Sequence, residues 1–212
     1  MPSLPISRFV ATATLLAASA AAGAAVTVQV TDAAGKPVSD AVVYAEAEPG
    51  QSLPAARKPG EIVQQGLKFI PLVTVVQTGS KIFFPNNDKV RHHIYSFSPA
   101  HKFDQKLYSG TTAEPQTFEK AGTVVLGCNI HDRMIAYVRV VETPYFAKTD
   151  AHGAATVDAP AGKYVLKAWH PDISGGQALE QPLAVRADAA AAASFRMTLK
   201  PVVRDADSIS SY

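Results

Sequence analysis

The sequence is organised around one stretch, VVLGCNIHDRM at residues 124–134. It contains the only cysteine of the chain, Cys128, which is followed by His131 and Met134 in the spacing Cys-x-x-His-x-x-Met. A thiolate, an imidazole and a thioether on one tight loop are soft ligands that together suit copper. Such a site also needs a second histidine brought in by the fold, and His92, 36 positions upstream of Cys128, is the candidate.

His93 is the competing candidate for that second histidine. Neighbouring residues on a strand point to opposite faces, so only one of His92 and His93 can point inward. Asn87 is a candidate to tie the His92 loop to the cysteine loop, or else an ordinary turn residue. The remaining histidines lie in loop-like contexts, which favours isolated surface residues over a weak second metal site: His101, His152 and His170.

The N-terminal residues 1–24 are predicted to be a secretory signal peptide. Arg8 is followed by a run of small and apolar residues without charge, which ends in AAGAA at residues 21–25 and offers small residues for cleavage. The alternative is an uncleaved membrane anchor, but the run is rich in alanine and only weakly apolar for a span of ~20 residues. We therefore expect an exported, periplasmic protein that begins near Ala25 and has no membrane span after cleavage.

A lone thiol in an oxidising compartment is a liability unless something occupies it, and a bound metal would do so. The alternative is a buried, inert cysteine, which is common.

The chain has 212 residues, with 20 basic and 18 acidic side chains and no polybasic run, so nucleic acid is not expected as a partner.

Short segments of alternating or β-branched residues predict strands throughout, and no segment has a convincing helical period, so the predicted fold class is all-β. Residues 98–112 are expected to be an irregular excursion, and the alanine-rich residues 188–193 a short helix or a loose turn. The polar C-terminal residues 201–212 are expected to form a flexible tail. The predicted strands lie at 26–31, 41–45, 62–63, 69–70, 73–76, 81–84, 92–97, 123–126, 135–141, 155–157, 164–169, 182–185 and 194–199.

The central part of the chain resembles the cupredoxins, the small blue-copper β-sandwiches. The resemblance rests on FPNNDKVRH at residues 84–92, on GTVVLGC at residues 122–128, and on the histidine and methionine that follow. It implies a Greek-key β-sandwich over residues 58–142 and one type 1 copper per chain. The copper ligands of the family fall on His92, Cys128, His131 and Met134. The whole chain also resembles exported cupredoxin-like proteins that are often labelled methylamine utilisation proteins.

The flanks resemble another family, the carboxypeptidase-regulatory or transthyretin-like sandwiches. TDAAGKPVSDAVV at residues 31–43 matches the opening strands of that family, and its usual continuation occurs only later, as TDAHG at residues 149–153 and PAGKYVL at residues 160–166. We therefore predict one small sandwich, formed by 25–47 and 143–200, into which the cupredoxin domain is inserted. The alternative is a single cupredoxin with an unrelated C-terminal extension.

The predicted function is the transfer of single electrons between redox proteins. Four protein ligands leave no open position for a substrate, so the protein is not expected to be an enzyme. The sequence has no His-x-His pair to build a further copper centre and no second cysteine for a dinuclear one. The alternative is a copper-binding accessory protein that delivers or stores copper in the periplasm.

Overall fold

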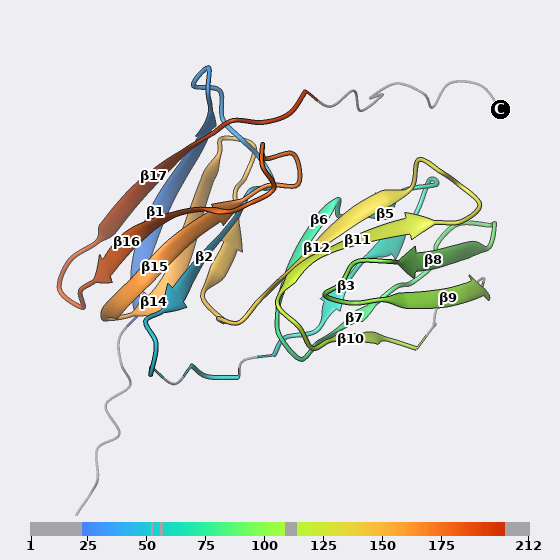
Figure 1. The fold of residues 1–212 in the computed structure, drawn as a ribbon, viewed down its shortest axis with the longest axis horizontal. Coiled ribbons are helices and arrows are strands. Elements are labelled where there is room, and N and C mark those ends of the chain that lie inside the picture. Colours follow the sequence, from blue (N-terminus) through green and yellow to red (C-terminus); the bar gives the residue numbers. More distant parts are fainter. Residues whose placement is uncertain (1–22, 52, 56, 109–113, 202–212) are drawn as a thin grey trace, which may run out of the picture.

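The computed structural model describes residues 23–51, 53–55, 57–108 and 114–201 (Figure 1). These residues form strands, turns and bends and contain no helix, so the prediction of an all-β protein is confirmed. It follows that the described ranges include no helix able to cross a membrane. The predicted signal peptide lies outside the described residues except for Gly23 and Ala24, which begin the first strand. The predicted tail lies outside them except for Pro201.

Strands from the two ends of the chain pair with one another in two sheets, called here the flanking sheets. The first has the order β14-β1-β17, with β1 antiparallel to β14 and parallel to β17. The second has the order β13-β2-β15-β16. Their bounds are β1 (Gly23–Asp32), β2 (Val42–Ala47), β13 (Phe146–Lys148), β14 (Ala154–Pro160), β15 (Gly162–Trp169), β16 (Leu179–Val185) and β17 (Ala191–Met197).

Alternation explains why the flanking sheets enclose a core. Val26, Val28 and Val30 of β1 are fully buried, while Thr27 and Gln29 between them are exposed. This is the two-residue period of a strand with one face on the core. The alanine-rich residues 188–193 agree with the predicted loose turn only at their start, where the chain turns at Asp188. Ala191 to Ala193 differ from the prediction, because they begin β17 and pair with β1. Pairing with a neighbouring strand overrides the weak local preference of alanine.

The strands between residues 60 and 141, called here the central unit, form one large sheet facing smaller ones. The large sheet has the order β6-β12-β11-β8-β9, a three-stranded sheet has the order β10-β7-β3, and β4 pairs with β5. The bounds are β3 (Gly60–Glu61), β4 (Val63–Gln64), β5 (Phe69–Ile70), β6 (Val73–Gln77), β7 (Ser80–Phe83), β8 (His92–Ser96), β9 (Phe103–Tyr108), β10 (Gln116–Phe118), β11 (Gly122–Cys128) and β12 (Ile135–Val141). The expectation of an irregular excursion over 98–112 is wrong at β9, which pairs with β8.

The central unit packs against the flanking sheets, which lie to its left in Figure 1. Arg139 of β12 lies over two aromatic rings of the flanking sheets, 5.5 Å from the ring centre of Tyr44 and 5.3 Å from that of Trp169. Its guanidinium also donates to the Tyr44 hydroxyl (2.6 Å) and to Thr123 Oγ1 (3.0 Å). Val73 and other residues of the central unit join the flanking core. The division into domains at 25–47, 58–142 and 143–200 stays a prediction.

We expect Arg139→Ala to lower the free energy of unfolding by about 2–3 kcal/mol, because two charge-assisted hydrogen bonds and two cation–π contacts are lost together. Urea denaturation followed by the fluorescence of Trp169, the only tryptophan, measures this loss. Arg196→Ala is the matched control, since Arg196 is an exposed arginine of β17 and its loss is expected to change stability by less than about 0.5 kcal/mol. Equal stability of the two variants would contradict the role assigned to Arg139.

Candidate metal centre

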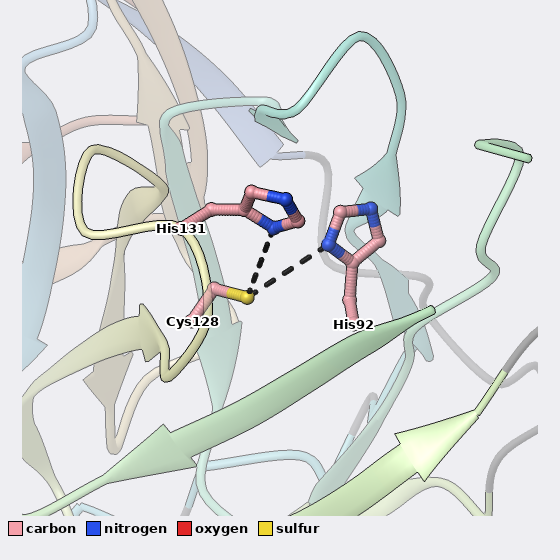
Figure 2. Close-up of side chains that lie close together, drawn as sticks. All are labelled: His92, Cys128 and His131. Carbon is pink, nitrogen blue, oxygen red and sulfur yellow. Dashed lines mark hydrogen bonds between the residues drawn. The ribbon is translucent and has the colours of Figure 1, made fainter. Parts of the chain in front are cut away.

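Three potential ligands from two parts of the sequence meet inside the central unit. Cys128 ends β11, His92 begins β8, and His131 lies in the loop between β11 and β12. The Sγ atom of Cys128 lies 3.8 Å from Nδ1 of His92 and 3.7 Å from Nδ1 of His131 (Figure 2). The three ligand atoms all lie within 4.8 Å of one another, and His131 is the least buried of the three.

The register between β8 and β11 brings His92 to the cysteine. These strands are antiparallel, and Cys128 pairs with Ile94. His92 lies two residues before Ile94, so it shares the inward face of Ile94 and lies beside the loop that carries His131. His92 and Ile94 are both fully buried, and Cys128 is 3% exposed. The site is therefore enclosed by the core of the central unit.

Met134 is held close to this group by a tight turn. Its backbone N–H donates to the carbonyl of His131 over 2.9 Å, and its side chain is 1% exposed. It belongs to the same cluster of buried apolar residues as Cys128. The thioether therefore lies in the core that surrounds the cysteine, and its role as a ligand stays a proposal.

His92 and His93 point to opposite faces, as strand alternation predicts. His93 Nε2 contacts the carboxylate of Asp104 on β9, and this imidazole is partly exposed. His92 is the histidine that lies beside Cys128. Only the face of β8 that points between the sheets can contribute to the site, and His92 is on that face.

Asp88 orients His92 from the side away from the cysteine. His92 Nε2 lies 2.8 Å from Asp88 Oδ2, while Nδ1 of the same ring faces the sulfur. An N–H on Nε2 that donates to the carboxylate leaves Nδ1 free to act as a ligand. The backbone N–H groups of Gly66 and Leu67 also donate to this carboxylate, over 2.6 and 3.1 Å. Burial raises the pKa of Asp88, but the hydrogen bonds from His92, Leu67 and Gly66 outweigh it and hold that pKa below its usual value.

Sequence reasoning left Asn87 as either a supporting residue or an ordinary turn residue, and the structure agrees with the turn residue. Asn87 is exposed, and its backbone N–H donates to the carbonyl of Gln64. The buried amide is its neighbour Asn86, which donates to the carbonyls of Val90 and Tyr108 and accepts from the N–H of Asp88. A carboxylate four residues before the ligand histidine, within a turn-forming segment, is the sequence signal that could have identified Asp88.

Two further polar residues near the site were missed by sequence reasoning. The hydroxyl of Tyr108 donates to the carbonyl of Phe84 over 2.5 Å, and the side-chain amide of Gln64 contacts the same hydroxyl and the same carbonyl. Burial raises the pKa of Tyr108 to about 12, with a smaller contribution from Cys128, although the hydrogen bond with Gln64 opposes it. Tyr108 is therefore a neutral hydrogen-bond donor at the base of the His92 loop.

The other three histidines do not join a metal-binding cluster within the described residues. His101 packs against Phe103 and Phe118, with ring centres 5.2 and 4.5 Å apart, and burial lowers its pKa while a hydrogen bond with Gln116 opposes this shift. His152 is exposed in a turn. His170 is buried, and its Nδ1 accepts from the N–H of Asp172.

Among the comparisons with known proteins, only the comparison with solved structures finds similar proteins. No protein-family profile and no curated protein matches the chain. A purple cupredoxin from Nitrosopumilus maritimus is 20% identical and has a TM-score of 0.35, over 39% of this chain and 99% of that one. Amicyanin from Paracoccus versutus is 18% identical with a TM-score of 0.37, over 46% of this chain and 91% of that one. A copper-containing nitrite reductase from Thermus scotoductus is 23% identical with a TM-score of 0.38, over 54% of this chain and 28% of that one.

We expect Asp88→Ala to weaken copper binding about 10- to 100-fold, the usual effect of removing a carboxylate that orients a metal-binding histidine. Competition titration against a chelator of known copper affinity measures the change. Asp104→Ala is the matched control, because it removes the carboxylate from His93 and should leave the affinity within about twofold. If both variants bind copper equally well, Asp88 does not orient the ligand.

Proposed function

We propose that the protein is a cupredoxin-like electron carrier that holds one type 1 copper ion through His92, Cys128, His131 and Met134. The observation that supports this best is the enclosed arrangement of one thiol between two imidazoles, each of which presents Nδ1 to the sulfur. A thiolate with two imidazoles and a weak thioether is the donor set of blue-copper electron-transfer sites.

The spacing of the donors fits a single metal ion. Metal–sulfur and metal–nitrogen bonds of about 2.3 and 2.05 Å, at a trigonal angle of about 120°, separate the sulfur from each nitrogen by about 3.8 Å. The two separations in the structure are 3.8 and 3.7 Å. Both separations are therefore compatible with one ion held between Cys128 and the two histidines. When bound, copper would supply a one-electron couple.

The surrounding residues favour electron transfer over catalysis or copper delivery. The core excludes water from His92, Cys128 and Met134, and Asp88 fixes the ring of His92. A complete set of four protein ligands leaves no place for a substrate, and a ligand set held rigidly by packing changes little between the two copper states. His131 is the ligand with access to solvent, so electrons would enter and leave through its edge.

We expect the protein, titrated with Cu(II), to bind one ion per chain and to develop an intense visible band from charge transfer between the Cys128 thiolate and copper. Cys128→Ser should abolish the band, and His92→Ala should weaken binding more than the matched variant His93→Ala. Visible absorption and electron paramagnetic resonance measure both effects. A band that survives Cys128→Ser would refute the assignment, and the reverse order of the histidine variants would move the ligand to His93.

Voltammetry distinguishes an electron carrier from an accessory protein that delivers or stores copper. A carrier should show a reversible one-electron couple and keep its copper through repeated cycles. A protein that binds copper but releases it on reduction would instead be an accessory protein for delivery or storage.

We also propose that the protein is exported to the periplasm, because the leader at residues 1–24 has the charge and composition of a signal peptide. N-terminal sequencing of the exported protein should find its start near Ala25. Cleavage there would remove Gly23 and Ala24 from β1 and retain its pairing from Ala25 onward. Recovery of the intact leader in a membrane fraction would contradict this proposal.

A further inference from the structure

Three loops meet beside the proposed copper ligands, and each carries an exposed apolar side chain. These are Leu67 between β4 and β5, Val90 between β7 and β8, and Ile130 between β11 and β12, which are 48%, 45% and 48% exposed. The Asp88 carboxylate joins the first two loops and His92 through its hydrogen bonds with Gly66, Leu67 and His92. Ile130 directly precedes His131.

The same loops carry exposed cations beside these apolar side chains. Lys68 follows Leu67, and Lys89 and Arg91 lie on either side of Val90. None of the three cations forms an ion pair with another described residue. These loops contain two carboxylates. Asp88 is hydrogen-bonded to His92 and to two backbone N–H groups, and Asp132 is exposed. We call the apolar residues Leu67, Val90 and Ile130, together with the cations Lys68, Lys89 and Arg91, the docking face.

The backbone of Leu67 indicates that this position is under an unusual constraint. Its φ angle is 56°, in the left-handed region that bulky side chains rarely adopt. Glycine is the usual residue there, because a Cβ strains this backbone conformation. The Leu67 N–H donates to Asp88, so the strained turn is tied directly to the carboxylate that orients His92. A strained, exposed leucine held beside a metal ligand suggests that its side chain serves an interaction.

We propose that the docking face binds a redox protein of complementary surface. This partner has an apolar patch over its own redox group, and carboxylates ring that patch. This inference rests on the proposed function as an electron carrier and adds the kind of partner. Apolar contact would bring the two redox groups together, and the opposite charges would steer the encounter. A second copy of this chain is the less favourable occupant, because it would bring the same cations against Lys68, Lys89 and Arg91.

The test uses a basic c-type cytochrome and its succinylated form, in which negative charges replace the lysine charges. Stopped-flow measurements follow electron exchange between each form and the copper-loaded protein at increasing ionic strength. We expect the acidic form to react at least about tenfold faster at low ionic strength, with a rate that falls as salt is added. The triple variant Lys68→Glu, Lys89→Glu and Arg91→Glu should reverse this preference.

A matched control separates the docking face from net charge. The triple variant Lys36→Glu, Lys163→Glu and Arg196→Glu makes the same change in charge at exposed positions of the flanking segments and should retain the preference of the unmodified protein. If both triple variants respond alike, or if the unmodified protein does not distinguish the two cytochromes, the docking face is refuted. A second-order rate constant for exchange that rises when the copper-loaded protein is diluted would instead identify a second copy as the occupant, because dilution would free the face.

Leu67→Gly tests the apolar part of the docking face. If the Leu67 side chain serves only stability, its removal should not slow electron exchange. Glycine accepts the positive φ angle, so we expect the free energy of unfolding to stay equal or to rise. Exchange with the acidic cytochrome should nevertheless slow about three- to tenfold, with the visible band and the reduction potential unchanged. An unchanged rate would refute the role of Leu67. A missing visible band in the unmodified protein would refute the proposed function itself, and this inference with it.

Discussion

The metal centre depends on the register between β8 and β11. Pairing of Cys128 with Ile94 places His92 on the inward face, beside the loop of His131. Because side chains alternate along a strand, a slip of one residue would turn His92 outward and His93 inward. The aliphatic residues of these strands oppose such a slip, since it would move the fully buried Ile94 of β8 to the solvent face, away from the buried Val124 and Leu126 of β11. The same packing that forms the core therefore selects which histidine faces Cys128.

The carboxylate of Asp88 then fixes the orientation of the His92 ring, which the strand register has turned inward. Asp88 faces Nε2 of His92 and accepts two backbone N–H groups from the turn between β4 and β5. A histidine buried in an apolar core needs hydrogen-bond partners for both ring nitrogens, and Asp88 supplies the one on the outer side. The inner nitrogen faces the sulfur of Cys128. One side chain thus sets the orientation of a ligand and the shape of a neighbouring surface loop.

The flanking sheets pack against one side of the central unit. Arg139 lies over Tyr44 and Trp169 and donates to the Tyr44 hydroxyl, while Val73 and Val141 pack into the flanking core. These contacts lie on the side of β12 and β6, whereas the docking face is formed by loops at the end of the unit that holds His131. The flanking sheets therefore contact a different part of the central unit from the loop that carries the partly exposed His131.

The sequence by itself determined the fold class and three residues that meet at the site. Alternation along β1 and β8 and the absence of a helical period predicted strands, and the spacing of Cys128 and His131 predicted a pair of ligands on one loop. Alternation also limited the second histidine to one of His92 and His93. These features depend on neighbours in the chain, and local patterns record them.

Only the tertiary structure decided the features that depend on contacts between distant segments. The backbone groups that bind Asp88 belong to a turn more than twenty residues away, at Gly66 and Leu67. The strand β9 and the first three residues of β17, Ala191 to Ala193, form because β8 and β1 offer them a free edge, which no property of 98–112 or 188–193 reveals. Arg139 meets Tyr44 across 95 positions of sequence. Such contacts follow from how the sheets pack, and packing becomes defined only when the whole chain has folded.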